Sequence, residues 1–367
     1  MRTTIISDIA LPPALAAALV AALAAAPAGP AGADPLDQDL QDQMTTRGIP
    51  GLAFAVVADG RIVDTRAYGS ANLETGAPAH AGTVWAIGSI TKSFTAIALM
   101  RLVEEGLVDL DAPLRTFVEP PHPDWGRVTV RQLVGNASGV PEFIDNPCGH
   151  VPAGDSPATR HDVLAEAACL PLGFEPGQRF AYANTNFHLI AEIIESVTGQ
   201  PFEAVVTARV LEPLGLRDTR FLDHERVIAH RADGYRRTDD GYLNEAPMDP
   251  LYEAAPGGLL STVTDMARFI LALGDPRLLP PERWREMWTP FPVREGHTPY
   301  GLGFGLTPLE GRARIGHNGS AVGFASAFSW FPAEGVGVVV LSNGYQEPFG
   351  RNVQDLAHRI VARHFEE

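Results

Sequence analysis

Short apolar runs typical of β-strands lie toward both ends of the chain. Residues 51–58 and 61–68 form two such runs, joined by Asp59-Gly60, a dipeptide typical of two-residue hairpins. Three more runs near the C-terminal end predict consecutive strands at 312–317, 324–331 and 336–341. The simplest arrangement is one antiparallel sheet to which both ends of the chain contribute.

Between these ends the apolar positions repeat every three or four residues, which predicts helices at 92–105, 186–197 and 262–273. A last amphipathic helix carries Val353, Leu356, Ile360 and Val361 on one face. We therefore predict an α+β fold, in which an antiparallel sheet built from both chain ends has flanking helices and a large inserted helical domain.

The first 33 residues are predicted to be a leader. Residues 14–26 are only Ala, Leu and Val, a run too short to span a bilayer, and Ala31-Gly32-Ala33 resembles a signal-peptidase site. A signal peptide begins with a basic segment, and Arg2 is the only basic residue before that run. A disordered Ala-rich leader is therefore the alternative. We expect a cleaved signal peptide at 1–33 and a secreted or periplasmic protein with no membrane association afterwards.

The remaining chain is then divided by its pattern into two parts. Residues 34–86 and 296–367 would form the α/β domain, and residues 87–295 the mostly helical domain.

The charge of the chain excludes some classes of partner. It has 367 residues, 28 of them basic and 44 acidic, which gives a formal net charge of −16. Such a surface argues against nucleic acid and anionic membranes as partners, and solubility is the simplest role of the charge.

The two cysteines, Cys148 and Cys169, are 21 positions apart. In an exported protein they can form a disulfide, and two free thiols are an equal alternative. Neither cysteine has CxxC spacing and the histidines show no HExxH pattern, so no metal site is predicted.

Lys92 is the only lysine of the chain, against 27 arginines. Arginine keeps its proton, whereas a desolvated lysine can lose it, so a single lysine indicates a role for a neutral amine. It ends the pattern S-x-x-K that begins at Ser89. On a helix these positions share a face, so the amine can accept the serine proton and activate the hydroxyl as a nucleophile.

Two further patterns carry polar groups that suit such chemistry. Tyr182-Ala183-Asn184 precedes the 186–197 helix, and its phenol and amide can relay a proton and bind a substrate amide. A second Y-x-N, Tyr242 to Asn244, lies in an expected polar loop and is discounted. In Gly316-His317-Asn318-Gly319-Ser320, glycines allow close approach to a bound acyl group, although an ordinary glycine-rich hairpin is the alternative.

In this order, S-x-x-K, Y-x-N and H-x-G resemble the penicillin-recognising serine hydrolases, which include class C β-lactamases, serine D,D-peptidases and related esterases. The stretches 257–261 and 300–303 agree, so the resemblance covers about residues 45–365. It is greatest to soluble D-alanyl-D-alanine carboxypeptidases.

The resemblance implies roles for individual residues. Ser89 would be acylated, Lys92 would remove its proton, and Tyr182 would relay protons. Asn184 would bind the substrate, with His317, Gly319 and Ser320 along its other side. The N–H groups of Ser89 and Ser320 would form the oxyanion hole, and no metal or organic cofactor would be needed.

Two departures from the family pattern affect the function. His317 stands where class C β-lactamases carry the lysine of K-T-G, which shifts the expectation away from antibiotic hydrolysis. Asn136 and Ala137 replace the His-Thr pair of a family segment that usually reads L-x-x-H-T-S-G, and we expect a structural consequence there.

The sequence therefore predicts a serine hydrolase that acts through an acyl-enzyme. The first expectation is a D-alanyl-D-alanine carboxypeptidase, with peptidoglycan-type peptides or other small molecules as substrates. An esterase and a β-lactamase are alternatives on the same machinery. A non-catalytic sensor of cell-wall peptide or β-lactam is a further alternative. β-Lactams are expected to acylate the site as inhibitors.

Overall fold

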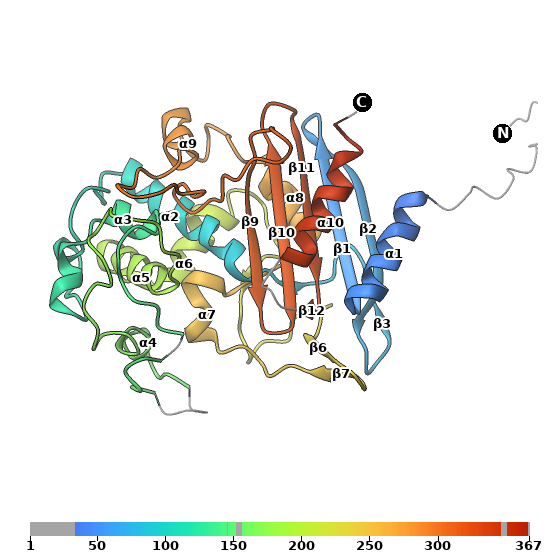
Figure 1. Ribbon diagram of the computed structural model, residues 1–367, viewed down its shortest axis with the longest axis horizontal. Coiled ribbons are helices and arrows are strands. Elements are labelled where there is room, and N and C mark those ends of the chain that lie inside the picture. The colour runs from blue at the N-terminus through green and yellow to red at the C-terminus, as the bar shows by residue number, and fades with distance from the viewer. Residues whose placement is uncertain (1–33, 145, 152–155, 346–350, 366–367) are drawn as a thin grey trace, which may run out of the picture.

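The computed structural model describes residues 34–144, 146–151, 156–345 and 351–365. The predicted signal peptide at 1–33 lies outside these ranges. A six-stranded antiparallel sheet occupies one half of the described molecule (Figure 1). From one edge to the other, its strands are β3 (Ala77–Pro78), β2 (Arg61–Asn72), β1 (Gly51–Ala58), β11 (Val336–Ser342), β10 (Phe324–Phe331) and β9 (Ile315–Ala321).

Both faces of this sheet are covered by helices. Helix α8 (Val263–Leu271) packs against β1, β11 and β2, while α10 (Arg351–Ala362) packs against β10 and β11 and contacts α1 (Pro35–Arg47). The central strands β1 and β11 are buried along almost their whole length, which explains why their sequences are continuous apolar runs. Strand β2 alternates between exposed and less exposed residues because it lies nearer the edge.

The other half of the molecule is mainly helical. Its larger helices are α2 (Thr91–Glu104), α5 (Thr185–Thr198) and α7 (Pro250–Gly257), which pack against one another. Shorter helices surround them: α3 (Val130–Val134), α4 (Arg160–Ala165), α6 (Phe202–Val206) and α9 (Pro281–Met287), with single turns at 88–90, 114–116, 123–127 and 207–211. Helix α2 is buried on nearly every side, so it is the core around which this half is built.

Two small sheets complete the fold. One contains β4 (Trp85–Ala86), β8 (Leu259–Ser261) and β5 (Arg220–Phe221), and the other β12 (Gly344–Tyr345), β6 (Tyr235–Thr238) and β7 (Gly241–Asn244). Within the described ranges, no helix is both long and apolar enough to cross a membrane.

Most predicted elements are present in the structure. The strands at 324–331 and 336–341 and the helices near 92–105, 186–197 and 262–273 all form, with ends shifted by at most two residues. The Asp59-Gly60 hairpin also forms, but its second strand, expected at 61–68, continues to Asn72. The predicted α+β fold is confirmed. Helix α8 belongs to the 87–295 range expected to be the helical domain, yet it packs on the sheet.

Two local predictions were wrong. The strand expected at 312–317 begins only at Ile315, because Arg312 closes a turn with Leu309, and it continues to Ala321 through its pairing with β10. The motif at 316–320 therefore lies inside a strand and not in a hairpin. Tyr242 to Asn244 was expected in a loop, but it forms β7, paired with β6 and exposed.

Cys148 and Cys169 are joined by a disulfide, with Cα atoms 5.7 Å apart. The Cys148 N–H donates to the backbone carbonyl of Glu166 at 3.0 Å, and the Cys169 N–H donates to the Cys148 sulfur at 3.0 Å. The segment at 146–151 is thus fixed to the end of α4.

Replacing both cysteines, Cys148→Ser with Cys169→Ser, should lower the free energy of unfolding by about 3 kcal/mol, because the disulfide restricts the unfolded chain. Urea unfolding followed by tryptophan fluorescence measures this, and the reduced wild-type protein should match the double variant. Equal midpoints for the oxidised and serine proteins would show that the disulfide adds no stability.

Candidate active site

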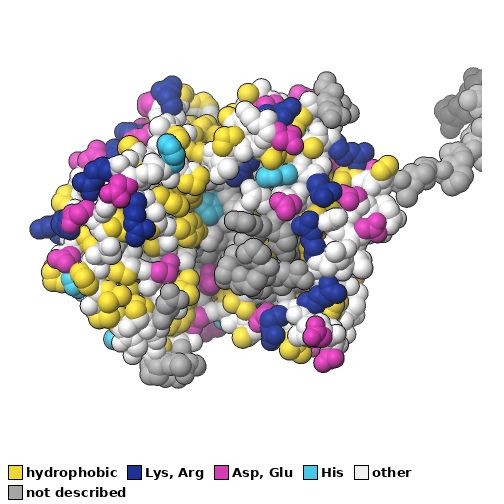
Figure 2. All heavy atoms as spheres, viewed as in Figure 1, with side chains coloured by type: hydrophobic (Ala, Val, Ile, Leu, Met, Phe, Trp, Pro, Cys, Tyr) yellow, Lys and Arg dark blue, Asp and Glu magenta, His cyan; other side chains and the backbone are white. Residues whose placement is uncertain are grey.

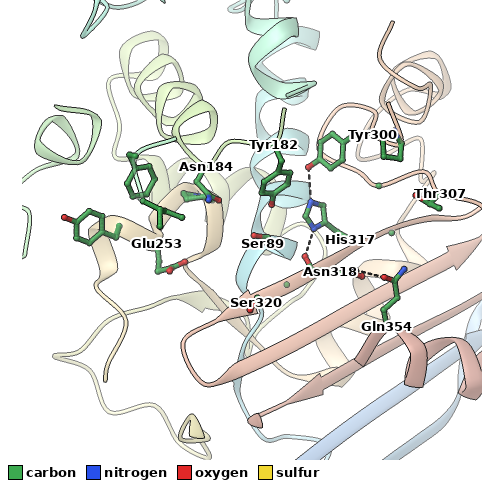
Figure 3. Close-up of a pocket in the computed structure, with 18 of the residues that line it drawn as sticks. Ser89, Tyr182, Asn184, Glu253, Tyr300, Thr307, His317, Asn318, Ser320 and Gln354 are labelled. Carbon is green, nitrogen blue, oxygen red and sulfur yellow. Dashed lines mark hydrogen bonds between the residues drawn. The ribbon is translucent and has the colours of Figure 1, made fainter. Parts of the chain in front are cut away.

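A pocket of about 870 Å³ lies between the mainly helical part of the molecule and the edge strand β9 (Figure 3). We call its two parts the helical half and the strand half. The helical half is lined by Phe143, Ile144, Asn146, Glu166, Asn184, Tyr252, Glu253 and Pro256. The strand half is lined by Pro299, Tyr300, Gly305, Thr307, Arg314, Gln354 and residues 316–320. Ser89 and Tyr182 lie between the two.

Ser89 lies in a single 3₁₀ turn, Gly88–Ile90, directly before α2. Gly88 has a φ of +50°, and a Cβ there would lie 2.6 Å from the Ser320 carbonyl oxygen. Only glycine permits this approach, because a side chain would both strain the backbone and collide with β9. The turn therefore holds Ser89 against the edge of the sheet.

The Lys92 amine is completely buried and is held by three oxygen atoms from three parts of the chain. Its Nζ lies 3.0 Å from Ser89 Oγ, 2.7 Å from Asn184 Oδ1 and 2.9 Å from the Pro256 carbonyl oxygen. Pro256 lies in the last turn of α7, where helix carbonyls lack intrahelical partners and can accept other donors.

Burial lowers the pKa of Lys92 to about 7, although the nearby carboxylates of Glu253 and Glu142 oppose this change. Its position in the first turn of α2 also disfavours a positive charge, since the helix dipole is positive there. Near neutral pH a substantial fraction of the amine is therefore unprotonated and can accept a proton.

Tyr182 covers Ser89 and Lys92 from the pocket side. Its ring centroid is 4.8 Å from Lys92 Nζ, and the ring is 40% exposed because it faces the pocket. Burial raises the pKa of its phenol well above the usual value, and a hydrogen bond with Ser89 partly offsets that rise. The phenol thus keeps its proton at neutral pH and is available as a donor.

Asn184 links Lys92 to a carboxylate that the sequence did not reveal. While its Oδ1 binds Lys92, its backbone N–H and one Nδ2–H donate to Glu142 Oε2 at 2.6 and 3.1 Å. Glu142 also accepts the Phe143 N–H at 2.8 Å, so its position is fixed. One N–H of the Asn184 amide remains for a ligand in the pocket.

Strand β9 presents a free edge to Ser89. Gly316 exchanges both its backbone hydrogen bonds with Gly305 on the outer side of β9, at 2.7 and 3.0 Å. Since alternate residues of a strand point their N–H and C=O groups to the same side, those of Ser320 also face outward, toward Ser89. A Cβ at Gly319 would lie 1.9 Å from the Ile87 carbonyl oxygen, so this close contact requires glycine.

His317 is buried and forms two hydrogen bonds. Its Nε2 is 2.9 Å from the Tyr300 hydroxyl and its Nδ1 is 2.6 Å from the Asn318 carbonyl oxygen, a pattern that fits a proton on Nδ1 (Figure 3). Burial lowers the pKa of His317 to about 3. The ring is neutral at pH 7, so any electrostatic contribution to a ligand comes from its dipole.

The two residues that depart from the family segment lie behind the Tyr182 motif. Asn136, with φ +53°, accepts the Ala181 N–H on its carbonyl and both the Ala183 N–H and the Asn186 amide on Oδ1. Ala137 is completely buried beside it. Their consequence is structural, because they hold the strand-like segment that carries Tyr182 and Asn184.

The structure thus brings together every residue predicted for the site: Ser89, Lys92, Tyr182, Asn184, His317, Gly319 and Ser320. It adds Glu142, Glu166, Tyr252, Glu253 and Tyr300. Tyr300 belongs to the 300–303 stretch that the sequence analysis had singled out. No sequence motif pointed to the other added residues. No group of three or more His, Cys, Asp or Glu side chains that could hold a metal exists within the described part of the chain.

This geometry supports a defined sequence of proton transfers. A neutral Lys92 amine can take the hydroxyl proton as Ser89 Oγ attacks a carbonyl carbon, and the outward N–H of Ser320 can stabilise the oxyanion together with that of Ser89. Tyr182 can then give its proton to the leaving group and recover one from the Lys92 ammonium. Water would then attack the acyl carbonyl, pass one proton through the same groups to Ser89 Oγ, and release the acyl group as an acid.

The family model described as Beta-lactamase matches residues 36–363 of the chain. This protein belongs to the β-lactamase family. The resemblance to penicillin-recognising serine hydrolases is thereby confirmed, and the chain is a member of a serine hydrolase family.

Relatives within the β-lactamase family have several activities. The D-aminopeptidase of Cereibacter sphaeroides is 30% identical over 315 residues, which are 84% of this chain and 60% of that protein. The structure of an octameric penicillin-binding protein homologue from Pyrococcus abyssi has 30% identity and a TM-score of 0.78, over 90% of this chain and 77% of that one. The structure of a D-amino acid amidase from Ochrobactrum anthropi SV3, solved with L-phenylalanine, has 26% identity and a TM-score of 0.79, over 90% of this chain and 98% of that one.

The chain spans less than two thirds of the length of the curated relatives it matches, at 60% to 66% of theirs.

Lys92→Arg should reduce kcat/KM by about 10²–10⁴-fold although it keeps the charge, because a guanidinium cannot act as base. Steady-state kinetics on an ester or amide that the wild-type protein hydrolyses measures the effect, and thermal melting verifies that the variant is folded. Ser89→Ala should abolish acylation and melt normally. Near-normal turnover by Lys92→Arg would disprove the role of Lys92 as base.

The pH profile should follow the protonation of Lys92. The amine accepts a proton only in its neutral form, so kcat/KM for a substrate without an ionisable amine should rise as pH increases through about 7 and level off above it. Glu253→Gln should shift the midpoint to lower pH, since the carboxylate stabilises the ammonium form. A flat profile from acidic to mildly alkaline pH would contradict the assignment.

Proposed function

We propose that this protein is a serine amidohydrolase that cleaves the amide bond following an N-terminal D-amino acid residue, through an acyl-enzyme on Ser89. The observation that carries the proposal is the Glu253 carboxylate. It lines the helical half of the pocket and has neither a hydrogen bond nor an ion pair among the described residues. A carboxylate in such a position lacks a cation, which the α-ammonium of the substrate would supply.

The surroundings of Glu253 support this proposal. Its side chain turns back over Gly257, where a Cβ would lie 2.1 Å from Oε2, so glycine leaves the carboxylate its room. The carboxylate points into the pocket near Asn184 (Figure 3). With its carbonyl oxygen toward the N–H groups of Ser89 and Ser320, an aminoacyl group attached to Ser89 would place its α-ammonium toward Glu253.

Charges along the rest of the pocket agree with this orientation. The charged residues lining it are Glu166 and Glu253 in the helical half and Arg314 in the strand half. An anionic helical half favours a cationic acyl group and repels a carboxylate. The preference for the D configuration rests on two relatives, which are named as a D-aminopeptidase and a D-amino acid amidase.

The D-alanyl-D-alanine carboxypeptidase predicted from the sequence is the second candidate, favoured by His317 in place of lysine. Such an enzyme holds the terminal carboxylate close to the scissile bond. His317 is neutral at that place, and the Arg314 guanidinium already donates to the Thr307 carbonyl at 2.9 Å and to the Ser329 hydroxyl at 3.2 Å. A terminal carboxylate therefore matches the strand half less well than an ammonium matches the helical half. The predicted secretion of the protein stays a prediction that cell fractionation would test.

A substrate panel tests the proposal. D-Phenylalanine amide should be hydrolysed faster than its L enantiomer and about 10–100-fold faster than N-acetyl-D-phenylalanine amide, as loss of a charge-assisted contact predicts. Glu253→Gln should remove the advantage of the free amine, whereas Glu225→Gln, an exposed glutamate outside the pocket, should preserve it. All variants are assayed at one pH near 7, where a substantial fraction of Lys92 is neutral and most of the substrate α-amine, with an ordinary pKa of about 7.7–8.0, is still an ammonium. Comparing the two substrates within each variant cancels any change in the charge of Lys92.

Each other outcome identifies a different function. Cleavage of an N-acylated D-Ala-D-Ala peptide alone would favour the carboxypeptidase. Turnover of a nitrophenyl ester alone would favour an esterase, and turnover of a cephalosporin alone a β-lactamase. If a fluorophosphonate left Ser89 unmodified in mass spectrometry, the protein would be a non-catalytic sensor.

A further inference from the structure

A second carboxylate lies deep in the helical half of the pocket. Glu166, at the end of α4, is completely buried. Its Oε1 accepts the Tyr252 hydroxyl at 2.8 Å, while its Oε2 has no hydrogen-bond partner among the described residues. No ion pair to it is present there either. An uncompensated buried carboxylate is costly, so this arrangement points to a cation supplied from outside the chain.

The walls above Glu166 suit the stem and head of a basic side chain. Phe143 and Tyr252 are stacked with ring centroids 5.7 Å apart and planes 5° from parallel, and Ile144 forms an exposed rim. Aromatic faces attract ammonium groups as well as methylene groups. His188 packs edge-on against Phe143, but burial lowers its pKa to about 3, so it brings no positive charge.

The carboxylate is also held in place. The backbone carbonyl of Glu166 accepts the Cys148 N–H, and the disulfide joins the segments that carry Asn146 and Glu166. Tyr252 connects the two acids, because its phenol donates to Glu166 at 2.8 Å and Glu253 follows it directly in α7. Both carboxylates line the helical half of the pocket.

We propose that this region is a subsite for a basic side chain, so that the preferred substrates are amides of D-lysine-like diamino acids. The side-chain ammonium would pair with Glu166 Oε2 with its stem against Phe143 and Tyr252, while the α-ammonium pairs with Glu253. The inference rests on the proposed function and specifies its substrate class. Binding forms and breaks no covalent bond beyond those of the acyl-enzyme reaction.

The test compares D-lysine amide with D-norleucine amide, which has a similar aliphatic stem without the ammonium. Wild-type protein should prefer D-lysine amide by at least about tenfold in kcat/KM, as a charge-assisted contact predicts. Glu166→Gln should reduce this ratio to near one. Glu225→Gln, the exposed control, should leave the ratio as in wild type.

The outcomes separate this inference from the proposed function. Equal turnover of the two amides by the wild type would overturn the subsite and leave the amidohydrolase proposal intact. Turnover of neither would overturn the subsite, and the proposed function would fall with it only if D-phenylalanine amide were also not hydrolysed. If Glu166→Gln fails to fold, inhibition of the wild type by free D-lysine and D-norleucine decides: a Ki at least about tenfold lower for D-lysine supports the subsite, and equal values overturn it.

Discussion

Burying the Lys92 amine without a direct ion pair is the constraint on which the rest of the site depends. An isolated ammonium in the interior is unfavourable, so the amine must be surrounded by acceptors or lose its proton. The structure does both, since three oxygens surround Nζ and the pKa falls to about 7. Each oxygen comes from a different element, so the turn at Ser89, the start of α5 and the end of α7 must meet at one point.

Contacts around α2 explain how these elements reach that point. The Thr91 hydroxyl accepts the Leu259 N–H, and the Thr95 hydroxyl donates to the Ala255 carbonyl, which fixes α7 and β8 beside α2. The Ser93 hydroxyl donates to the Gly303 carbonyl on the opposite side. Polar residues of one buried helix thus position the walls of the pocket. On the face shown in Figure 2, acidic and basic side chains are interspersed.

Much of the fold and the centre of the site could be predicted from the sequence. Apolar periodicity located the central strands and the main helices because burial determines it directly. Ser89 and Lys92 were found because their spacing is local and the lysine is unique. The end of β9 could not be predicted from the sequence, because its pairing with β10 continues through Gly316 and Gly319 to Ala321. Sequence reasoning did not identify Glu142, Glu166 and Glu253 as site residues. Glu142 binds Asn184, which is distant in sequence, and Glu166 and Glu253 have carboxylate oxygens without partners among the described residues. Neither property produces a local sequence pattern.

The burial of a unique lysine has a practical consequence. An isotope label on lysine would place its only side-chain amine signal at the centre of the site, free of background from other residues. Its chemical shift would report the charge of that one nitrogen through every stage of turnover. Because the amine is fully enclosed, an amine-directed reagent would reach it only when the surrounding elements separate, so the rate of its modification would measure how often the site opens.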